Sequence, residues 1–158
     1  MWSAFALLVA AWGFLIVLAP LAEANNLTGV SNPIYKFFGF LCHQNPERSL
    51  AFGEHAFAVC TRCFGVYFGL FFGFIIYPFL RRSIEETEPL PRFWLFPAMI
   101  PMAIDWVLGV FGIWENTHLS RFLTGAVLGA ACAVFIVPAL IEIFGLLSSQ
   151  RQVKRLSG

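Results

Sequence analysis

Two short stretches of this chain gather side chains that bind metal ions or exchange electrons. The first reads CHQNPERS and contains Cys42 and His43, and the second reads CTRC and contains Cys60 and Cys63. Three thiolates and one imidazole form a tetrahedral ligand set for zinc, and thiolates also suit other thiophilic metals. The spacing therefore predicts a metal site with these four residues as ligands, holding zinc or another thiophilic metal.

The order of the four residues puts conditions on this site. At the start of a helix, positions i and i+3 place both sulfurs of CTRC on one side. The segment between the two stretches is long enough to fold back onto that helix end. Because neighbouring residues rarely both bind one ion, we expect either Cys42 or His43 to act as a supporting residue behind the ligands.

The same cysteines allow two other interpretations. A C-x-x-C on the oxidising side of a membrane suits a disulfide or a thiol-exchange pair, and buried reduced cysteines can be inert. Phe64 follows Cys63, so the motif is not the C-x-x-C-H of covalent haem attachment. Cys132 stands alone in an apolar run, where we expect it to pack as a small hydrophobic residue.

Charged residues within or beside apolar runs form a second constellation. These residues are Arg62, Asp105 and Arg121. An ion inside a membrane is costly, so it normally faces the protein interior and has a partner. We expect Asp105 to pair with Arg62 or Arg121. In an enzyme these three would be the catalytic residues, with Asp105 as the acid or base; otherwise the pair only fixes the packing.

Further polar residues are expected on the same side of the membrane. Arg48, Asn116 and Thr124 are candidates for holding a substrate such as an anionic lipid headgroup. The alternative is that polar residues gather near membrane interfaces without a specific ligand.

Long apolar runs must position these residues. The chain has 158 residues, of which 59% are hydrophobic and only 12% are charged, against about 25% charged residues in soluble domains. Four runs, at about 2–22, 56–80, 93–114 and 120–146, reach the ~20 residues that a membrane-crossing helix needs. The sequence therefore predicts an all-α fold. Residues 1–158 form one transmembrane bundle of four helices, with a short re-entrant or interfacial segment on the outer side.

Basic residues set the expected orientation. Three arginines lie in the loop at 81–92, and three basic residues lie in the tail at 151–155. Cytoplasmic loops are rich in such residues, so both termini should lie in the cytoplasm and the cysteine stretches should face outward. The stretch LAEANN at 21–26 resembles a signal-peptidase site, but no basic residue precedes the first run. We therefore expect that run to stay as a helix.

Small residues predict where helices approach closely. Gly65, Gly69 and Gly73 recur every four residues in the second run. Such a small-xxx-small stripe lets two helix backbones come together in a membrane. We expect it to be a packing device.

Taken together, the stretches CHQNPERS and CTRCFGVYFG, the aspartate of the third run and the stretch RFLTGAVLG resemble a known prokaryotic family. It is domain of unknown function 2085, and the resemblance covers about residues 38–130. It implies a multi-pass inner-membrane protein and implies no reaction. Trp106 stands where a smaller residue is expected. The residues that match the family pattern are Cys42, His43, Arg48, Ser49, Cys60, Arg62, Cys63, Gly65, Asp105, Asn116, Arg121, Thr124 and Gly125.

These observations predict a multi-pass protein of the inner (plasma) membrane, with a Cys/His metal site and an Arg/Asp cluster on the outer side. We expect membrane lipid around it, a lipid, quinone or other small molecule as its substrate, and no nucleic acid partner. The alternatives are a membrane thiol/disulfide redox protein and a small transport or structural subunit. An enzyme should have a lipid-width cleft at Asp105, whereas a transporter should have internal repeats or broken helices.

Overall fold

The computed structural model describes residues 2–83, 93 and 95–156. Within that part of the chain the fold is mostly helical, as predicted, with five α-helices, one 3-10 turn and a two-stranded hairpin. The elements are α1 (Trp2–Ala24), α2 (Thr28–Gly39), the 3-10 turn (Pro46–Arg48), β1 (Ala51–Phe52), β2 (His55–Ala56), α3 (Thr61–Ser83), α4 (Leu95–Val110) and α5 (His118–Leu156).

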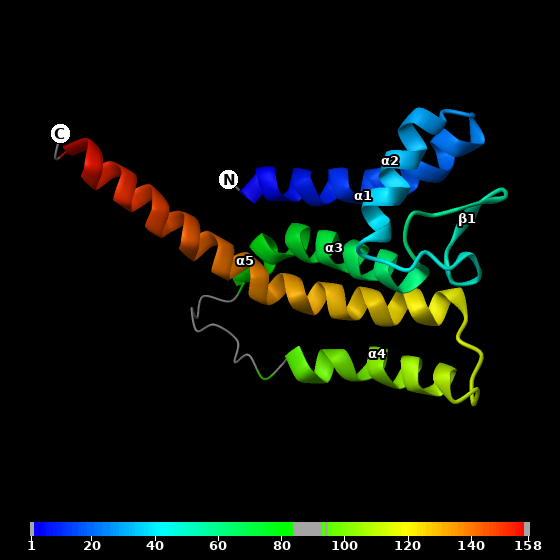
Figure 1. Ribbon diagram of the computed structural model, residues 1–158. Coiled ribbons are helices and arrows are strands. Elements are labelled where there is room, and N and C mark those ends of the chain that lie inside the picture. Colours follow the sequence, from blue (N-terminus) through cyan, green and yellow to red (C-terminus); the bar gives the residue numbers. More distant parts are fainter. Residues whose placement is uncertain (1, 84–92, 94, 157–158) are drawn as a thin grey trace.

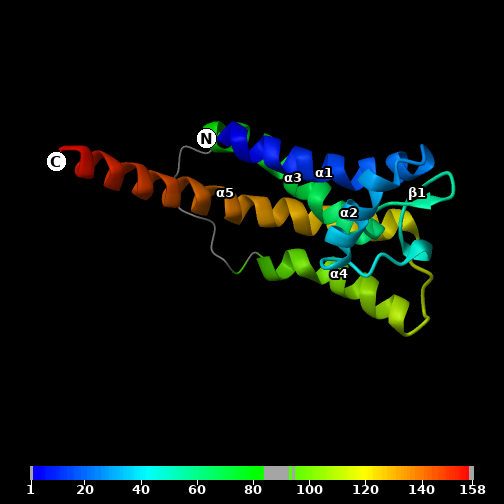
Figure 2. The same ribbon diagram turned by 45° about the horizontal axis from the view of Figure 1, so that its top comes forward.

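The four long helices lie side by side (Figure 1). α3 packs mainly against α5, α1 covers another side of α3, and α4 packs against α5. Figures 1 and 2 show that α3 and α5 begin at the same end of the molecule, where α2 and the hairpin also lie. The last part of α5 extends beyond the other helices (Figure 1).

Two helices of the described chain are long and apolar enough to cross a membrane, judged by length and composition. They are the segments Ala6–Ala24 and His118–Leu140, and the apolar parts of α3 and α4, Thr61–Tyr77 and Leu95–Val110, are shorter. Two candidate spans are therefore seen where four were predicted. Residues 84–92, which make up most of the predicted basic inner loop, lie outside the described part of the chain.

Three helix boundaries differ from the sequence prediction by four residues or more. One is the end of α5, which lies at Leu156 rather than near residue 146. α3 begins at Thr61 rather than near residue 56, because His55 and Ala56 pair with Phe52 and Ala51 in the antiparallel hairpin. α4 ends at Val110 rather than near residue 114. Gly112, with φ of +65°, then turns the chain in a left-handed conformation that glycine adopts without a Cβ clash.

Glycines join α3 to α5 at backbone contact. A Cβ added to Gly65 or Gly69 would collide with main-chain atoms of α5, and a Cβ added to Gly125 or Gly129 would collide with main-chain atoms of α3. The expected packing role of the stripe on α3 is confirmed. The matching stripe on α5 was not predicted. It makes the contact reciprocal, so neither helix can shift without opening the interface.

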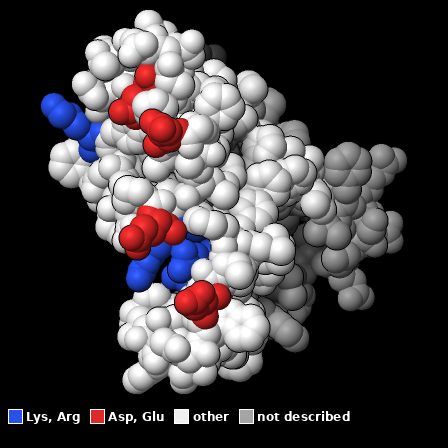
Figure 3. Space-filling view, turned by 90° about the vertical axis from the view of Figure 1, so that its right-hand side faces the viewer, with Lys and Arg blue, Asp and Glu red and all other residues white. Residues whose placement is uncertain are grey.

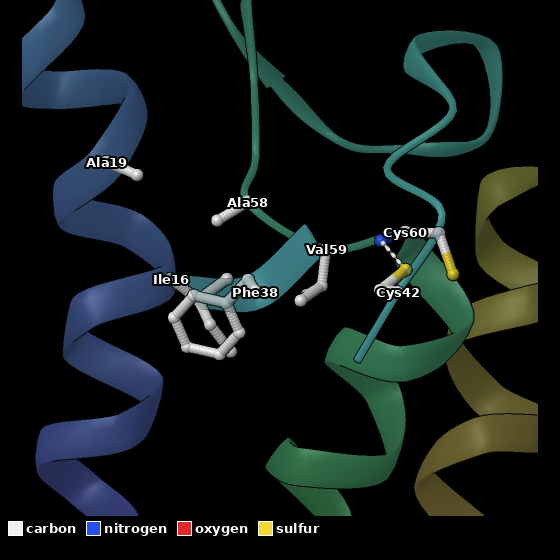
Figure 4. Close-up of a cluster of buried hydrophobic side chains, with 7 residues drawn as sticks. All are labelled: Ile16, Ala19, Phe38, Cys42, Ala58, Val59 and Cys60. Atoms are coloured by element: carbon white, nitrogen blue, oxygen red, sulfur yellow. Dashed lines mark hydrogen bonds between the residues drawn. The ribbon is translucent and has the colours of Figure 1, made fainter. Parts of the chain in front are cut away.

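The segment between α1 and α3 has a core of its own. Tyr35 of α2 donates its hydroxyl hydrogen bond to the Ala56 carbonyl oxygen at 2.6 Å, which ties α2 to the hairpin. Trp12 of α1 meets Phe38 edge to face, with ring centroids 5.2 Å apart. The buried residues of this core are Ile16, Ala19, Phe38, Cys42, Ala58, Val59 and Cys60 (Figure 4).

α2 occupies the place where an interfacial or re-entrant segment was predicted. It lies at the end of the bundle beside the hairpin (Figure 1). Phe38 is buried, whereas Val30 and Phe37 on α2, and Phe40 and Leu41 just after it, are exposed. The interfacial or re-entrant position of this segment stays a prediction.

Candidate functional site

Three cysteine sulfurs converge beside the start of α3. The sulfur atoms of Cys42, Cys60 and Cys63 all lie within 4.8 Å of one another. Cys42 and Cys60 are buried, Cys63 is half-buried, and none of the three forms a disulfide. Zinc–thiolate bonds of about 2.3 Å place tetrahedral sulfurs about 3.8 Å apart. Thiolates at this separation can therefore bind one ion with small side-chain movements.

Gln44 positions Cys42. Its side-chain Nε2 donates hydrogen bonds of 2.8 Å to the carbonyl oxygens of Tyr35 and Ala58. The first oxygen belongs to α2 and the second to the segment between β2 and Cys60. Gln44 itself turns the chain with a left-handed φ of 48°. This residue was not among the predicted site residues, although an amide beside Cys42 in an apolar chain is a usable signal.

The returning hairpin positions Cys60 and Cys63. Its tight turn brings the chain back to α2, and the backbone N–H of Cys60 then donates a hydrogen bond to the Cys42 sulfur at 3.2 Å (Figure 4). Cys63 lies one helical turn further on, on the same side. The expected fold-back of the segment between the two cysteine stretches onto the helix end is confirmed.

Hydrogen bonding inside this cluster favours a thiolate. Cys60 precedes α3, and its pKa is lowered mainly because Cys63 donates a side-chain hydrogen bond to its sulfur, with a smaller contribution from Cys42. A thiolate, rather than a thiol, is both the metal ligand and the nucleophile. The cluster therefore suits metal binding and thiol exchange alike.

His43 does not join the three sulfurs. Its side chain is exposed, and the group of potential ligands consists of the three cysteines. The Cys42 side chain faces the core, so the side chain of the next residue, His43, faces away from the core. Another histidine lies closer to the start of α3: His118 Nδ1 is 3.0 Å from the hydroxyl of Thr61, which follows Cys60. His43 as a ligand stays a prediction without a supporting contact.

Asp105 is buried and forms an ion pair, for which the sequence predicted either Arg62 or Arg121 as the partner. Arg62 Nη2 donates to Asp105 Oδ2, and the two side chains are 15% and 8% exposed. The expected ion pair is therefore confirmed for Arg62. Asn116 adds a second contact, because its Nδ2 donates to the same carboxylate oxygen at 3.2 Å and also to the Asp105 carbonyl oxygen.

Gly109 makes room for Asn116. A Cβ added to Gly109 would lie 2.6 Å from Asn116 Nδ2. Asn116 therefore reaches Asp105 only because the helix position one turn after the aspartate carries no side chain. These contacts describe a carboxylate held as a counter-ion, and an acid–base role for Asp105 stays a prediction.

The other predicted site residues are Arg48, Arg121 and Thr124, and their contacts differ. Arg121 is within electrostatic range of Arg48, Arg62 and Asp105. Figure 3 shows Lys and Arg side chains gathered in a hollow of this end face, with acidic side chains beside it. Thr124 donates its hydroxyl hydrogen bond to the Ser120 carbonyl oxygen of its own helix at 2.8 Å. The arginines are thus brought together, and the Thr124 hydroxyl is used within α5.

An apolar groove lies elsewhere, between α1 and α3. Its volume is about 330 Å³, and Gly13 and Phe14 of α1 and Tyr67 and Phe68 of α3 are among its lining residues. The groove is on the cysteine side of α3, whereas Asp105 of α4 pairs with Arg62. It is therefore not the cleft at Asp105 that an enzyme was expected to have.

Comparison with known proteins agrees with the apolar composition. The sequence profile of the family described as "Predicted membrane protein (DUF2085)" matches residues 42–151. "Uncharacterized protein MJ1492" of Methanocaldococcus jannaschii is 36% identical over 133 residues, covering 81% of this chain and 85% of that protein. An "Uncharacterized protein" of Methanothermobacter thermautotrophicus is 37% identical over 97 residues, covering 61% of this chain and 85% of that protein. No solved structure matches the chain. The clustered cysteines and the ion pair all fall inside the matched region.

Proposed function

The chain belongs to this DUF2085 family of predicted membrane proteins, and we propose that it binds a thiophilic metal ion, zinc foremost, at the outer end of a four-helix transmembrane bundle. In this proposal the protein lies in the inner (plasma) membrane, and both termini lie in the cytoplasm. The metal ligands are Cys42, Cys60 and Cys63.

The observation that carries the proposal is the convergence of three sulfurs from two separate segments. A hydrogen bond supports the same interpretation, because the Cys60 N–H donates to the Cys42 sulfur. Inert cysteines that pack as hydrophobic residues would not need this bond. Both the hydrogen bond and the N-terminus of α3 favour negative charge on the sulfurs. Catalytic zinc sites commonly have three protein ligands, with a fourth position for water or substrate.

A role on a lipid or quinone substrate is the finer part of the proposal. The end face that bears the sulfurs also bears the arginines around Asp105, and the apolar groove between α1 and α3 borders Tyr67. Membrane-soluble molecules with a polar head can reach both regions from the outer interface. Asp105 then acts by holding Arg62 in place.

Metal analysis of the purified full chain tests the proposal. We expect about one equivalent of zinc or another thiophilic metal per chain by mass spectrometry of the elements, as one such site implies. Cys60→Ser and Cys63→Ser should each lose the metal, because a hydroxyl is a poor substitute for a thiolate. Cys132→Ser is the matched control, since Cys132 is half-buried in α5 and outside the cluster. Metal that stays bound in all three variants would contradict the proposal.

Thiol–disulfide exchange is the second candidate function. It is favoured by the lowered pKa of Cys60, which has Cys63 three residues on and Cys42 against its backbone N–H. Mass spectrometry of non-reduced, alkylated protein separates the two functions. A Cys60–Cys63 or Cys42–Cys60 disulfide without metal would support exchange and reject the metal site.

The proposed orientation has its own test. A membrane-impermeant thiol reagent applied to intact cells should label a cysteine introduced by Thr117→Cys, just before α5, and should not label one introduced by Thr87→Cys. The reverse pattern would place the sulfur cluster on the cytoplasmic side and would reject the proposed topology.

A further inference from the structure

The arginine group on the end face carries more charge than its protein partners balance. Arg62 shares an ion pair with Asp105. Among the described residues, Arg48 and Arg121 have no carboxylate within 4.0 Å, although Arg121 interacts electrostatically with both other arginines. Within 4.0 Å, the three guanidinium groups therefore have one carboxylate among the described residues, while Cys60 and the acidic side chains at the rim of the hollow lie further off. Repulsion among three neighbouring guanidinium groups is unfavourable, and an anion bound among them would offset it.

A buried donor within this group also lacks an acceptor. Arg62 Nε is buried and has no hydrogen-bond partner in the described structure, while Nη2 of the same guanidinium bonds Asp105. Buried polar groups normally have partners, so an unpaired one beside excess positive charge points to a missing acceptor. Asn116 Oδ1 in the same cluster is also buried without a partner, so the internal contacts of Arg62 are incomplete and an anion would have to offset the charge from the exposed side.

The group is accessible from outside. Arg48, the last residue of the 3-10 turn, is exposed, and Arg121 in the first turn of α5 is partly exposed. Figure 3 shows the hollow in which basic side chains gather on this end of the molecule. Because α3 and α5 are apolar below this point, the hollow lies at the level of headgroups in the proposed bundle.

We propose that this hollow binds a phosphate group, with the guanidinium groups of Arg48 and Arg121 as the donors and the Arg62 guanidinium beside them adding positive charge. Guanidinium groups match phosphate oxygens in paired, charge-assisted hydrogen bonds. A phosphate monoester, with close to two negative charges at neutral pH, would neutralise the two excess arginines. The phosphate can belong to a lipid headgroup or to a soluble compound. The donors of this site are different residues from the metal ligands, although Arg121 also interacts electrostatically with Cys60.

The test is native mass spectrometry of the full chain in non-ionic detergent, titrated with phosphatidic acid, with diacylglycerol as the uncharged counterpart, and with inorganic phosphate. Arg121→Gln should weaken binding of the phosphate-bearing probe about 10-fold or more, because a charge-assisted hydrogen bond is lost. Arg48→Gln should weaken it several-fold. Lys36→Gln is the matched control, because Lys36 is an exposed cation of α2 that is not part of the group.

Each outcome decides the proposal. Arginine-dependent binding of phosphatidic acid alone identifies a lipid headgroup, and arginine-dependent binding of inorganic phosphate identifies a soluble ligand. Equal losses for Lys36→Gln and Arg121→Gln would mean general charge attraction and would reject the site, as would binding of diacylglycerol equal to that of phosphatidic acid. Since Arg48 is exposed, Arg48→Gln keeps the test valid if Arg121→Gln fails to fold.

Discussion

The start of α3, together with Cys60 directly before it, has two faces with opposite chemistry. On one face, Cys60 and Cys63 meet Cys42 in a core made by α1, α2 and the hairpin. On the other face, Arg62 meets Asp105 of α4 beside the α3–α5 contact. The first face is built from segments close in sequence, and the second from helices that are far apart. One helical turn can thus hold a thiolate cluster and an ion pair apart because adjacent residues differ by about 100° in direction.

The comparison also separates two means of support. Side-chain hydrogen bonds of Gln44 stabilise the cysteine face, whereas close backbone packing of α3 against α5 supports the arginine face. If this difference is real, changes on one face should leave the other face intact. Because α3 begins between the two faces, a change that disrupts the α3–α5 contact should remove both together.

The largest effect is expected for Gly125→Leu. A leucine there would press on the Arg62 carbonyl oxygen and neighbouring main-chain atoms of α3, which cannot move aside as a side chain can. Overpacking usually costs about 1–3 kcal/mol, and more against backbone. We expect loss of folded protein in size-exclusion chromatography. The control is Gly13→Leu in α1, where an added Cβ meets nothing within 4 Å. A Gly125→Leu protein that melts like the parent would contradict the glycine contact.

Asp105→Asn should break the arginine face alone. It leaves Arg62 without its counter-charge at a mostly buried position, and loss of one partner of a buried pair costs about 3–5 kcal/mol. Thermal unfolding should occur at a lower temperature, while metal content per folded chain should stay unchanged. Glu115→Gln, an exposed carboxylate one residue before Asn116, serves as the control. Metal loss in the Asp105 variant would mean that the two faces are coupled.

Gln44→Ala should weaken the cysteine face with a smaller effect on unfolding. It removes two hydrogen bonds that hold the Cys42 loop against the chain leading to Cys60, and residues that orient metal ligands are worth about 10–100-fold in affinity. A competition titration with a zinc chelator measures this loss. Asn45→Ala is the control, because its side chain only accepts a hydrogen bond from the exposed Glu47 N–H. Equal zinc affinity in the parent and the Gln44→Ala variant would contradict the positioning role of Gln44.

Gly109→Ala is expected to have the smallest effect. The new methyl group would displace the Asn116 amide from Asp105 while the Arg62 pair stays in place. The loss of one hydrogen bond is worth about 1 kcal/mol. Unfolding of Gly109→Ala, Asn116→Ala and the double variant forms a cycle. The double variant should be no less stable than Asn116→Ala, and additive losses would show that Gly109 acts independently of Asn116.

Much of this arrangement was readable from local patterns. Apolar runs predict the helical fold, and the i, i+3 spacing of CTRC predicts that Cys60 and Cys63 share a side. The cost of an unpaired ion in an apolar run predicts a partner for Asp105. Each inference uses only helix periodicity or the free energy of transfer from water, which depend on neighbouring residues in the chain.

Other features were decided by the tertiary structure alone. The choice of Arg62 over Arg121 as the partner of Asp105 depends on the rotation of α3, α4 and α5 about their axes, which the glycine contacts set. The separation of His43 from the sulfurs depends on the loop conformation that Gln44 stabilises. Helix rotation and loop closure are settled by contacts between residues far apart in the chain, and the period of one helix carries no information about them.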